Sequence, residues 1–347
     1  MSETPELRAG PPWAMEEMIA AEPGLVEPVL ASPAAAALAE RVSASVAAGE
    51  PVVMTGCGTS EHAAMAGAAI LGEAVPRDAV LARDAFEASL DPQRGGVLIA
   101  VSHESATPAT LAAARAAAGR DAEVAVITAR PDRAPAGALV YATPLVDRSW
   151  CHTVGYLSPM LACHAVAAHF ADRAPACGPV REAIEAALAR RDTLGDGASR
   201  LDRCERLLAV GSGVDEITAR ELALKIEEGA HVPVTPLGVE KVLHGHLPAA
   251  DTRTGVIVVL ADPHAQERRA ARAAEALRAT GELGMPSVLL QLDEPAGLPP
   301  AAGALLAGAL AAQLLTLELV HARGTNPDLI RRDEEPYRRA AEVAEAG

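Results

Sequence analysis

Short runs of apolar residues alternate with longer alanine-rich stretches along most of the chain. The runs lack the apolar–polar alternation of a half-exposed strand, which is typical of strands buried on both faces of a parallel sheet. We expect strands over Val52–Thr55, Val97–Val101, Val124–Ile127 and Ala138–Tyr141, then over Leu207–Val210, Val256–Leu260 and Ser287–Leu290. The stretches between them predict helices near 60–73, 107–118, 153–171, 215–229, 264–280 and 303–322.

This alternation predicts an α/β fold in which helices cover both faces of each parallel sheet. Two glycine-containing turns, Thr55–Gly58 and Val210–Gly213, each close the first strand of a half, and Gly56 and Gly211 lie 155 positions apart. The spacing indicates that one α/β unit occurs twice in tandem. We therefore expect an N-terminal arm over 1–30, a first domain over 31–173, a linker helix over 174–203, a second domain over 204–322 and a polar tail over 323–347.

Composition and charge narrow the class of protein. Half of the 347 residues are apolar and 22% are charged, which is typical of a globular chain with two domains. The net charge of −16 argues against a nucleic-acid partner. The first 30 residues carry acids and prolines, unlike a secretory signal, and no run of about 18 uninterrupted apolar residues predicts a membrane span. We expect a cytoplasmic protein that binds neither nucleic acid nor membrane.

Cysteine, histidine and lysine limit the chemistry. The five cysteines are scattered without a Cys-x-x-Cys pair, which argues against disulfides and a thiolate zinc site. His244 and His246 lack a third ligand at a usable spacing, so we expect no metal. Lys225 and Lys241 are the only lysines among 30 basic residues. They either mark the need for a compact, titratable amine or persist by chance.

Two polar turns follow predicted strands of the first sheet. Gly56–Ser60 joins a strand to a helix whose free N-terminal amides can bind an anion. Ser102–Thr107 follows another strand, and ligands of open parallel sheets collect at the carboxyl ends of the strands. Together the turns predict one crevice, although each alone is equally consistent with a helix start that binds nothing.

A third group of candidates lies in the second half. Glu221, Lys225 and Glu228 are spaced so that they share one helix face. Such spacing usually marks a solvated, salt-bridged face, but the apolar residues between them predict a largely buried helix. His244 follows in a segment where charged and imidazole groups alternate with apolar residues.

On these motifs, the chain resembles the sugar isomerase (SIS) family. Val53–Ser60 resembles the signature of that family, and Glu221–Glu228 resembles its "E-G-A-L-K-L-K-E". Met15–Pro23 and Arg323–Asp328 resemble its opening segment and the start of its C-terminal tail. The whole chain is similar to the isomerase half of glutamine–fructose-6-phosphate aminotransferase and to stand-alone phosphosugar isomerase and deaminase relatives. The resemblance implies two tandem SIS domains, each a parallel sheet between two layers of helices.

The resemblance also implies roles for individual residues. Glu228 falls on the base that moves a proton between C1 and C2 of an open-chain sugar, and Lys225 falls on a lysine near that base. His244 falls on a ring-opening histidine that relatives supply from the neighbouring subunit. The implied substrate-binding residues are Gly58, Thr59, Ser60, Ser102, His103, Glu104, Thr107 and Lys241. Because this proton transfer needs a carboxylate but no metal or organic cofactor, we expect no cofactor. The resemblance also implies a homodimer with shared active sites.

Two departures from the family leave the substrate open. Glu104 places a carboxylate where relatives bind phosphate through a serine, and we expect His103 to be its counter-charge. Glu335 stands where the tail of relatives has an imine-forming lysine, for which Lys241 is the candidate substitute. With no glutaminase domain before the isomerase part, we expect no amino transfer from glutamine. The chain is expected to isomerise, deaminate or deglycate a sugar, phosphorylated or not.

The alternative is a non-catalytic regulatory protein that binds a sugar phosphate. The altered phosphate loop and the missing tail lysine favour that interpretation. The retained Glu228 and His244 favour an enzyme instead, and fold resemblance alone would not decide between the two.

Overall fold

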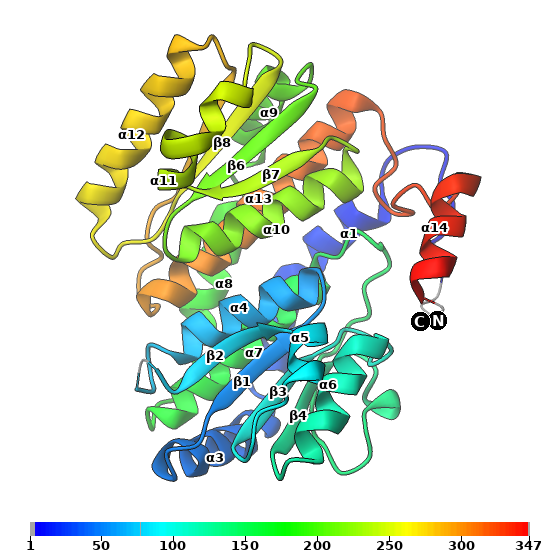
Figure 1. The fold of residues 1–347 in the computed structure, drawn as a ribbon, viewed down its shortest axis with the longest axis vertical. Helices are drawn as coiled ribbons and strands as arrows, with labels where there is room; N and C mark the ends of the chain where they lie inside the picture. The colour runs from blue at the N-terminus through cyan, green and yellow to red at the C-terminus, as the bar shows by residue number, and fades with distance from the viewer. Residues whose placement is uncertain (1–3, 77, 346–347) are drawn as a thin grey trace.

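Two α/β units make up the molecule, one above the other in Figure 1. This computed structural model describes residues 4–76 and 78–345. The first unit is built on a parallel sheet with the strand order β2-β1-β3-β4-β5. Its strands are β1 (Val52–Gly56), β2 (Val80–Asp84), β3 (Val97–Val101), β4 (Glu123–Thr128) and β5 (Leu139–Ala142).

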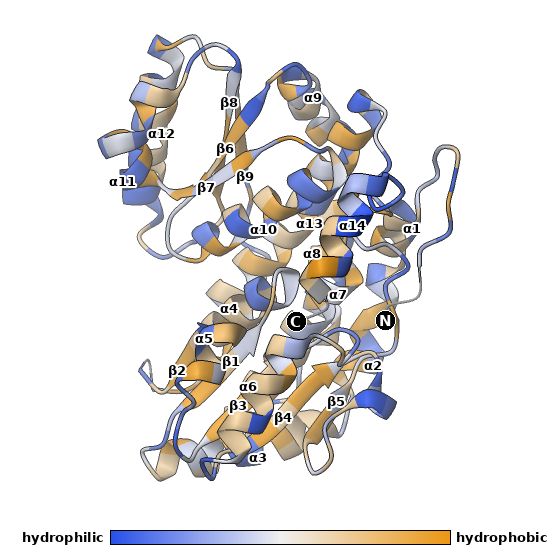
Figure 2. Ribbon diagram, turned by 45° about the vertical axis from the view of Figure 1, so that its right-hand side comes forward, coloured by the Kyte–Doolittle hydropathy of each residue, from blue (hydrophilic) through white to orange (hydrophobic). Residues whose placement is uncertain are grey.

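Helices cover both faces of this first sheet. Alternate residues of β1 point to opposite sides, so Met54 joins the large core that several helices share, and Val53 joins a smaller cluster with Ala114 and Ala117. Figure 2 shows that apolar residues dominate β3 and β4, as expected of strands covered on both faces. The helices of this unit are α3 (Ala34–Ala47), α4 (Thr59–Leu71) and α7 (Val154–Phe170) on one face, with α5 (Ala85–Leu90) and α6 (Pro108–Ala118) on the other.

The second unit repeats this layered arrangement with a four-stranded parallel sheet in the order β7-β6-β8-β9. Residues of its strands again alternate between the two faces of the sheet: Leu207 packs into one core cluster and Leu208 into another. The strands are β6 (Arg206–Gly211), β7 (Val234–Gly238), β8 (Thr254–Leu260) and β9 (Ser287–Gln291). The helices are α10 (Val214–Gly229), α11 (Val239–Lys241), α12 (Gln266–Glu282) and α13 (Pro300–Arg323). The predicted α/β class, with parallel sheets between helices, is confirmed.

The helices α4 and α10 pack against each other where the two units meet (Figure 1). Each follows the first strand of its unit and begins at a glycine with positive φ, Gly58 at +57° and Gly213 at +62°. At Gly56 an added Cβ would lie 2.5 Å from the Ser60 backbone. Only glycine permits so close an approach of strand end and helix start. Because α4 packs against α10 of the other unit, the turn that begins α4 lies at the boundary between the units.

Among the described residues, α13 is the one helix long and apolar enough to cross a membrane. However, 94% of its most apolar window is buried inside the protein. Contacts with α8 (Cys177–Leu188), α9 (Arg191–Leu201) and α10 bury this apolar surface, so the composition of α13 is that of a core helix.

Two strands were not expected from the sequence, β2 and β7. Both lie at the edge of a sheet, next to the first strand of their unit. Of the five residues in β2 only Val80 is buried, and β7 contains Pro236, which removes a backbone donor. Because edge strands need neither a continuous apolar run nor a complete set of donors, the hydrophobic pattern did not reveal them.

The segments outside the two sheets are helical and packed. The expected arm contains α1 (Ala14–Ala21) and α2 (Val26–Leu30), joined by η1 (Glu22–Leu25), and it contributes Met15 to one core and Val26 to the other. The expected linker helix consists of two helices, α8 (Cys177–Leu188) and α9 (Arg191–Leu201).

The tail is tied to the arm through one carboxylate. Asp328 is fully buried, and its two oxygens accept hydrogen bonds from the backbone amides of Ala14 and Met15, both at 2.8 Å. A negative side chain that binds the free amides of α1 stabilises the start of that helix. Beyond it the tail forms α14 (Glu335–Glu345).

Replacing Asp328 by alanine should lower the free energy of unfolding by about 1–3 kcal/mol, because two buried amides lose their acceptors. Chemical denaturation measures the change. The exposed Asp333 of the same tail is the matched control, and Asp333→Ala should stay within about 0.5 kcal/mol. Equal effects of the two substitutions would contradict this role of Asp328.

Candidate functional site

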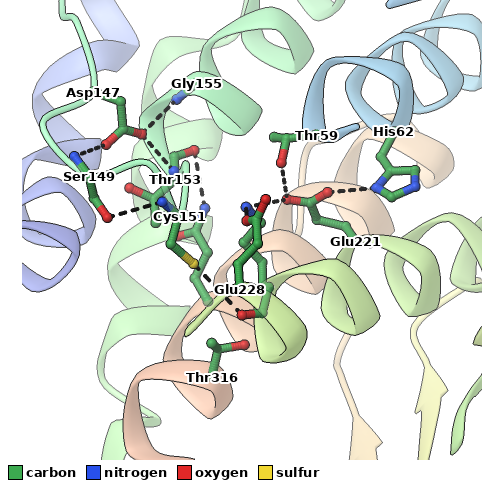
Figure 3. Close-up of polar contacts among 12 residues, drawn as sticks. Thr59, His62, Asp147, Ser149, Cys151, Thr153, Gly155, Glu221, Glu228 and Thr316 are labelled. Carbon is green, nitrogen blue, oxygen red and sulfur yellow. Dashed lines mark hydrogen bonds and ion pairs between the residues drawn. The ribbon is translucent and has the colours of Figure 1, made fainter. Parts of the chain in front are cut away.

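Three charged residues of α10 form a chain of contacts at the boundary between the units (Figure 3). Lys225 has no exposed surface; its Nζ makes a short ion pair with Glu228 and lies 3.7 Å from Glu221 Oε1. From α4, the Thr59 hydroxyl donates to Glu221 Oε1 at 3.3 Å, and His62 Nδ1 lies 2.7 Å from Glu221 Oε2. The expected helix face is therefore a buried ionic cluster that joins α4 to α10.

The two carboxylates of this cluster differ in accessibility. Glu221 is buried and held by three partners, whereas 21% of the Glu228 side chain is exposed. Burial raises the pKa of the Glu228 carboxyl, and the Lys225 ammonium offsets this only in part. Glu228 is thus the acid of the cluster that can both reach a ligand and exchange a proton.

Lys225 is a fixed cation. Burial alone would lower its pKa, but the carboxylates of Glu228 and Glu221 raise the pKa above the ordinary lysine value. The suggestion that this lysine is kept as a titratable amine is therefore wrong for Lys225. Its ammonium supplies positive charge in a site with little water.

The turn before α4 borders this cluster. A Cβ on Gly58 would lie 3.8 Å from Leu224 of α10, so the turn lies close to the face of α10. The hydroxyl of Thr59 is engaged with Glu221, as described above. Ser60 is half-buried in the first turn of α4. The anion-binding features expected of this turn and the acid–base candidates therefore lie at the same boundary.

The second polar turn begins directly after β3. Ser102 is buried and its hydroxyl has no hydrogen-bond partner among the residues that the structure describes, whereas Thr107 is exposed just before α6. The Glu104 side chain is 11% exposed and pairs with Arg133 NH1 at 3.2 Å. The counter-charge of Glu104 is thus an arginine 29 residues further along the chain.

His103 does not supply the expected positive charge. Its Nε2 accepts a hydrogen bond from the Asp147 amide at 2.8 Å, and its ring centroid lies 5.0 Å from that of His152. Burial lowers the pKa of His103, so the imidazole is neutral at physiological pH. The prediction that His103 is the counter-charge of Glu104 is therefore wrong, and the ring instead supports the segment that begins at Asp147.

That segment, residues 147–155, was missed by the sequence analysis. The Asp147 carboxylate accepts from the amides of Ser149, Thr153 and Gly155 at 3.2, 2.7 and 3.3 Å (Figure 3). Cys151 Sγ lies 3.7 Å from the Lys225 carbonyl oxygen, so the segment also touches α10. The signal available in the sequence was Asp147, an acidic residue between a strand and a helix. Polar residues that follow β5 lie at the carboxyl edge of the sheet, where ligands of such sheets bind.

His244 and Lys241 lie on the outer face of the second unit. His244 belongs to η3 (Val242–His246), is 71% exposed, and lies 3.2 Å from Glu240 and 3.4 Å from Arg272. Lys241 is exposed and lies 3.5 Å from Glu216. Within the described part of one chain, neither side chain contacts Glu228.

The part of the chain that the structure describes contains no cluster of three or more histidine, cysteine, aspartate or glutamate residues able to hold a metal ion. His244 is paired with Glu240 and Arg272, as described above.

Comparison with known proteins finds likeness in structure and not in sequence. No family model and no curated protein sequence matches the chain. The C-terminal domain of glucosamine-fructose-6-phosphate aminotransferase from Francisella tularensis is 16% identical, with a TM-score of 0.76 over 93% of this chain and 99% of that one. Tagatose-6-phosphate ketose/aldose isomerase from Escherichia coli is 18% identical, with a TM-score of 0.76 over 94% and 98%.

A third solved structure is named as a deaminase. Glucosamine-6-phosphate deaminase from Thermotoga maritima is 16% identical, with a TM-score of 0.71 over 91% of this chain and 96% of that one. The likeness extends over nearly the whole of both chains in each of the three cases. The expected resemblance is confirmed at the level of structure: this chain has the fold of these three proteins.

Proposed function

We propose that the protein is an enzyme that isomerises or deaminates an open-chain phosphorylated sugar or amino sugar by proton transfer at C1 and C2, with Glu228 as the base. The observation that carries this proposal is the half-buried Glu228 carboxylate, paired with a fully buried ammonium beside the turn at Gly58. Proteins with the same fold are named for reactions on tagatose 6-phosphate and glucosamine 6-phosphate, which supports the substrate class.

The electrostatics of the cluster suit such a proton transfer. A carboxyl whose pKa is raised by burial is a stronger base than an ordinary glutamate. Removal of a proton next to a carbonyl places negative charge on the sugar oxygens, and the fixed Lys225 ammonium stabilises that charge. Glu221 has a different role: its contacts with Thr59 and His62 hold Lys225 in position.

The phosphate is proposed to bind between the two polar turns. The hydroxyls of Ser60, Ser102 and Thr107 offer donors to an anion. The unpartnered Ser102 hydroxyl supports this placement, because a buried polar group without a partner is costly. Arg133 adds a cation that is neutralised by Glu104 in the absence of ligand.

We further propose that the active protein is a homodimer in which His244 and Lys241 act in the site of a second copy. Both are exposed and lie away from Glu228 within one chain, as a residue that acts across a subunit boundary must. His244 would then move a proton at the ring oxygen, and Lys241 would contact the sugar in place of the missing tail lysine.

A regulatory role without catalysis is the second candidate. The observation that favours it is the Glu104 carboxylate on the turn proposed to bind phosphate, since like charges weaken anion binding. Turnover of a bound sugar phosphate separates the two candidates, because a regulatory protein would bind the sugar without converting it.

Replacing Glu228 by glutamine should lower turnover by about a hundredfold or more, because the amide keeps the shape of the side chain and cannot accept the proton. Turnover is measured on tagatose 6-phosphate, fructose 6-phosphate and glucosamine 6-phosphate, and binding by thermal shift. The exposed neighbour Glu227 is the control, and Glu227→Gln should leave turnover unchanged. A Glu228→Gln protein with wild-type turnover would remove this residue from the mechanism.

Replacing Glu104 by serine should tighten the binding of a sugar phosphate by roughly tenfold, or about 1.4 kcal/mol. The change removes a negative charge and releases Arg133 to face the phosphate. Isothermal titration with one phosphorylated sugar and its unphosphorylated form measures the effect. Weaker binding of the phosphorylated form would contradict a phosphate in this crevice, and unchanged binding would place Glu104 outside it.

Mixing inactive Glu228→Gln protein with inactive His244→Ala protein should restore part of the activity. A hybrid dimer then contains one site with both an intact Glu228 and an intact His244. Subunit exchange is verified with differently tagged copies, so that a negative result is informative. If exchanged dimers stay inactive, His244 does not act across a subunit boundary.

A further inference from the structure

A pocket lies at the other end of α4 from the candidate active site. It has a volume of about 580 Å³ and is bounded by the C-terminal ends of α4 and α7, the segment after α7 and residues 297–300 before α13. With a rise of 1.5 Å per residue, the 13 residues of α4 separate it from the Thr59 end by about 18 Å. Its size lies within the range of small-molecule sites, and it is bounded by segments of both units.

His164 of α7 lines this pocket, and across residues 4–76 and 78–345 neither of its ring nitrogens has a hydrogen-bond partner. The side chain is 4% exposed, and burial, reinforced by the nearby Arg173 charge, lowers its pKa to about 4. The ring is therefore neutral at physiological pH and offers one donor and one acceptor. Leaving both unpaired in the interior is unfavourable, so an occupant with a hydroxyl or an amide would be favoured here.

Two further ionisable side chains line the pocket, and they carry opposite charges. Arg173 is exposed and, within the described part of the chain, its guanidinium makes no ion pair or hydrogen bond with another residue. Glu73 accepts a hydrogen bond from the Ala301 amide at 2.9 Å through Oε1. Its carboxylate is thereby held at the start of α13. Apolar residues, among them Ile70 and Leu298, form most of the remaining wall.

We propose that this pocket binds a free α-amino acid whose side chain ends in a hydroxyl or an amide. The carboxylate would pair with Arg173, the ammonium would face Glu73, and the polar end of the side chain would satisfy His164. A zwitterion fits because the pocket offers one positive and one negative group beside an apolar wall. This inference does not depend on the reaction at Glu228.

The pocket residues explain why smaller analogues should bind less well. Ethanolamine carries the ammonium and hydroxyl of serine but no carboxylate for Arg173. Glycerate carries the carboxylate and a hydroxyl but no ammonium for Glu73. Each analogue therefore leaves one charged group of the pocket without its partner.

Thermal shift of the full chain against each of the common amino acids, up to about 10 mM, tests the proposal. Serine, threonine, asparagine or glutamine should raise the unfolding midpoint in a concentration-dependent way, and ethanolamine and glycerate should do so at least about tenfold less effectively. Isothermal titration then gives the affinity for the best amino acid. Absence of any shift, or equal binding of the analogues, would overturn the proposal.

Variants locate the binding. Arg173→Gln and His164→Phe should each weaken the affinity by about tenfold or more. Asp172→Asn, an exposed change at the neighbouring position, should leave the affinity unchanged. Because Arg173 is exposed, its substitution leaves the core intact and keeps the test valid even if His164→Phe destabilises the fold. Amino-acid binding that survives Arg173→Gln would place the site elsewhere.

Discussion

A lysine ammonium without exposed surface must be neutralised where it lies, and the arrangement of this molecule's candidate site depends on that constraint. An isolated ion in the interior costs of order several kcal/mol, and breaking a buried pair leaves an uncompensated charge. Lys225 is neutralised by Glu221 and Glu228, four residues before it and three after it on the same face of α10. The cluster is thus set by one helix, whereas its burial requires α4 from the other unit.

The contact with α4 gives the carboxylates of Glu221 and Glu228 different surroundings. Thr59 and His62 contact the two carboxylate oxygens of Glu221, so the role of Glu221 is structural. Glu228 keeps Lys225 as its ionic partner and part of its surface remains exposed. The turn that begins α4 also carries the proposed phosphate donors. A single helix-to-helix contact therefore positions the proposed base, its cation and the proposed anion site together.

Much of this arrangement could be predicted from sequence, where the signal was local. Continuous apolar runs gave the inner strands, and the spacing of Glu221, Lys225 and Glu228 gave their shared face. The partners of these residues could not be found in this way, because His62 lies 159 positions from Glu221 and nothing in the sequence relates them. His103 was expected to be the counter-charge of Glu104, and its Nε2 instead accepts a hydrogen bond from the Asp147 amide. The direction of a side chain in a turn depends on tertiary packing, which the local sequence pattern does not determine.

Glu228 is proposed to move a proton at C1 or C2 of a sugar phosphate. Incubation with fructose 6-phosphate, tagatose 6-phosphate or glucosamine 6-phosphate in D₂O, followed by nuclear magnetic resonance, tests it directly. Proton transfer through an exchangeable carboxyl predicts deuterium at C1 or C2 of at least one of these sugars with the wild-type protein, and none with Glu228→Gln. Conversion of a sugar without deuterium incorporation, or equal incorporation by both proteins, would contradict the account.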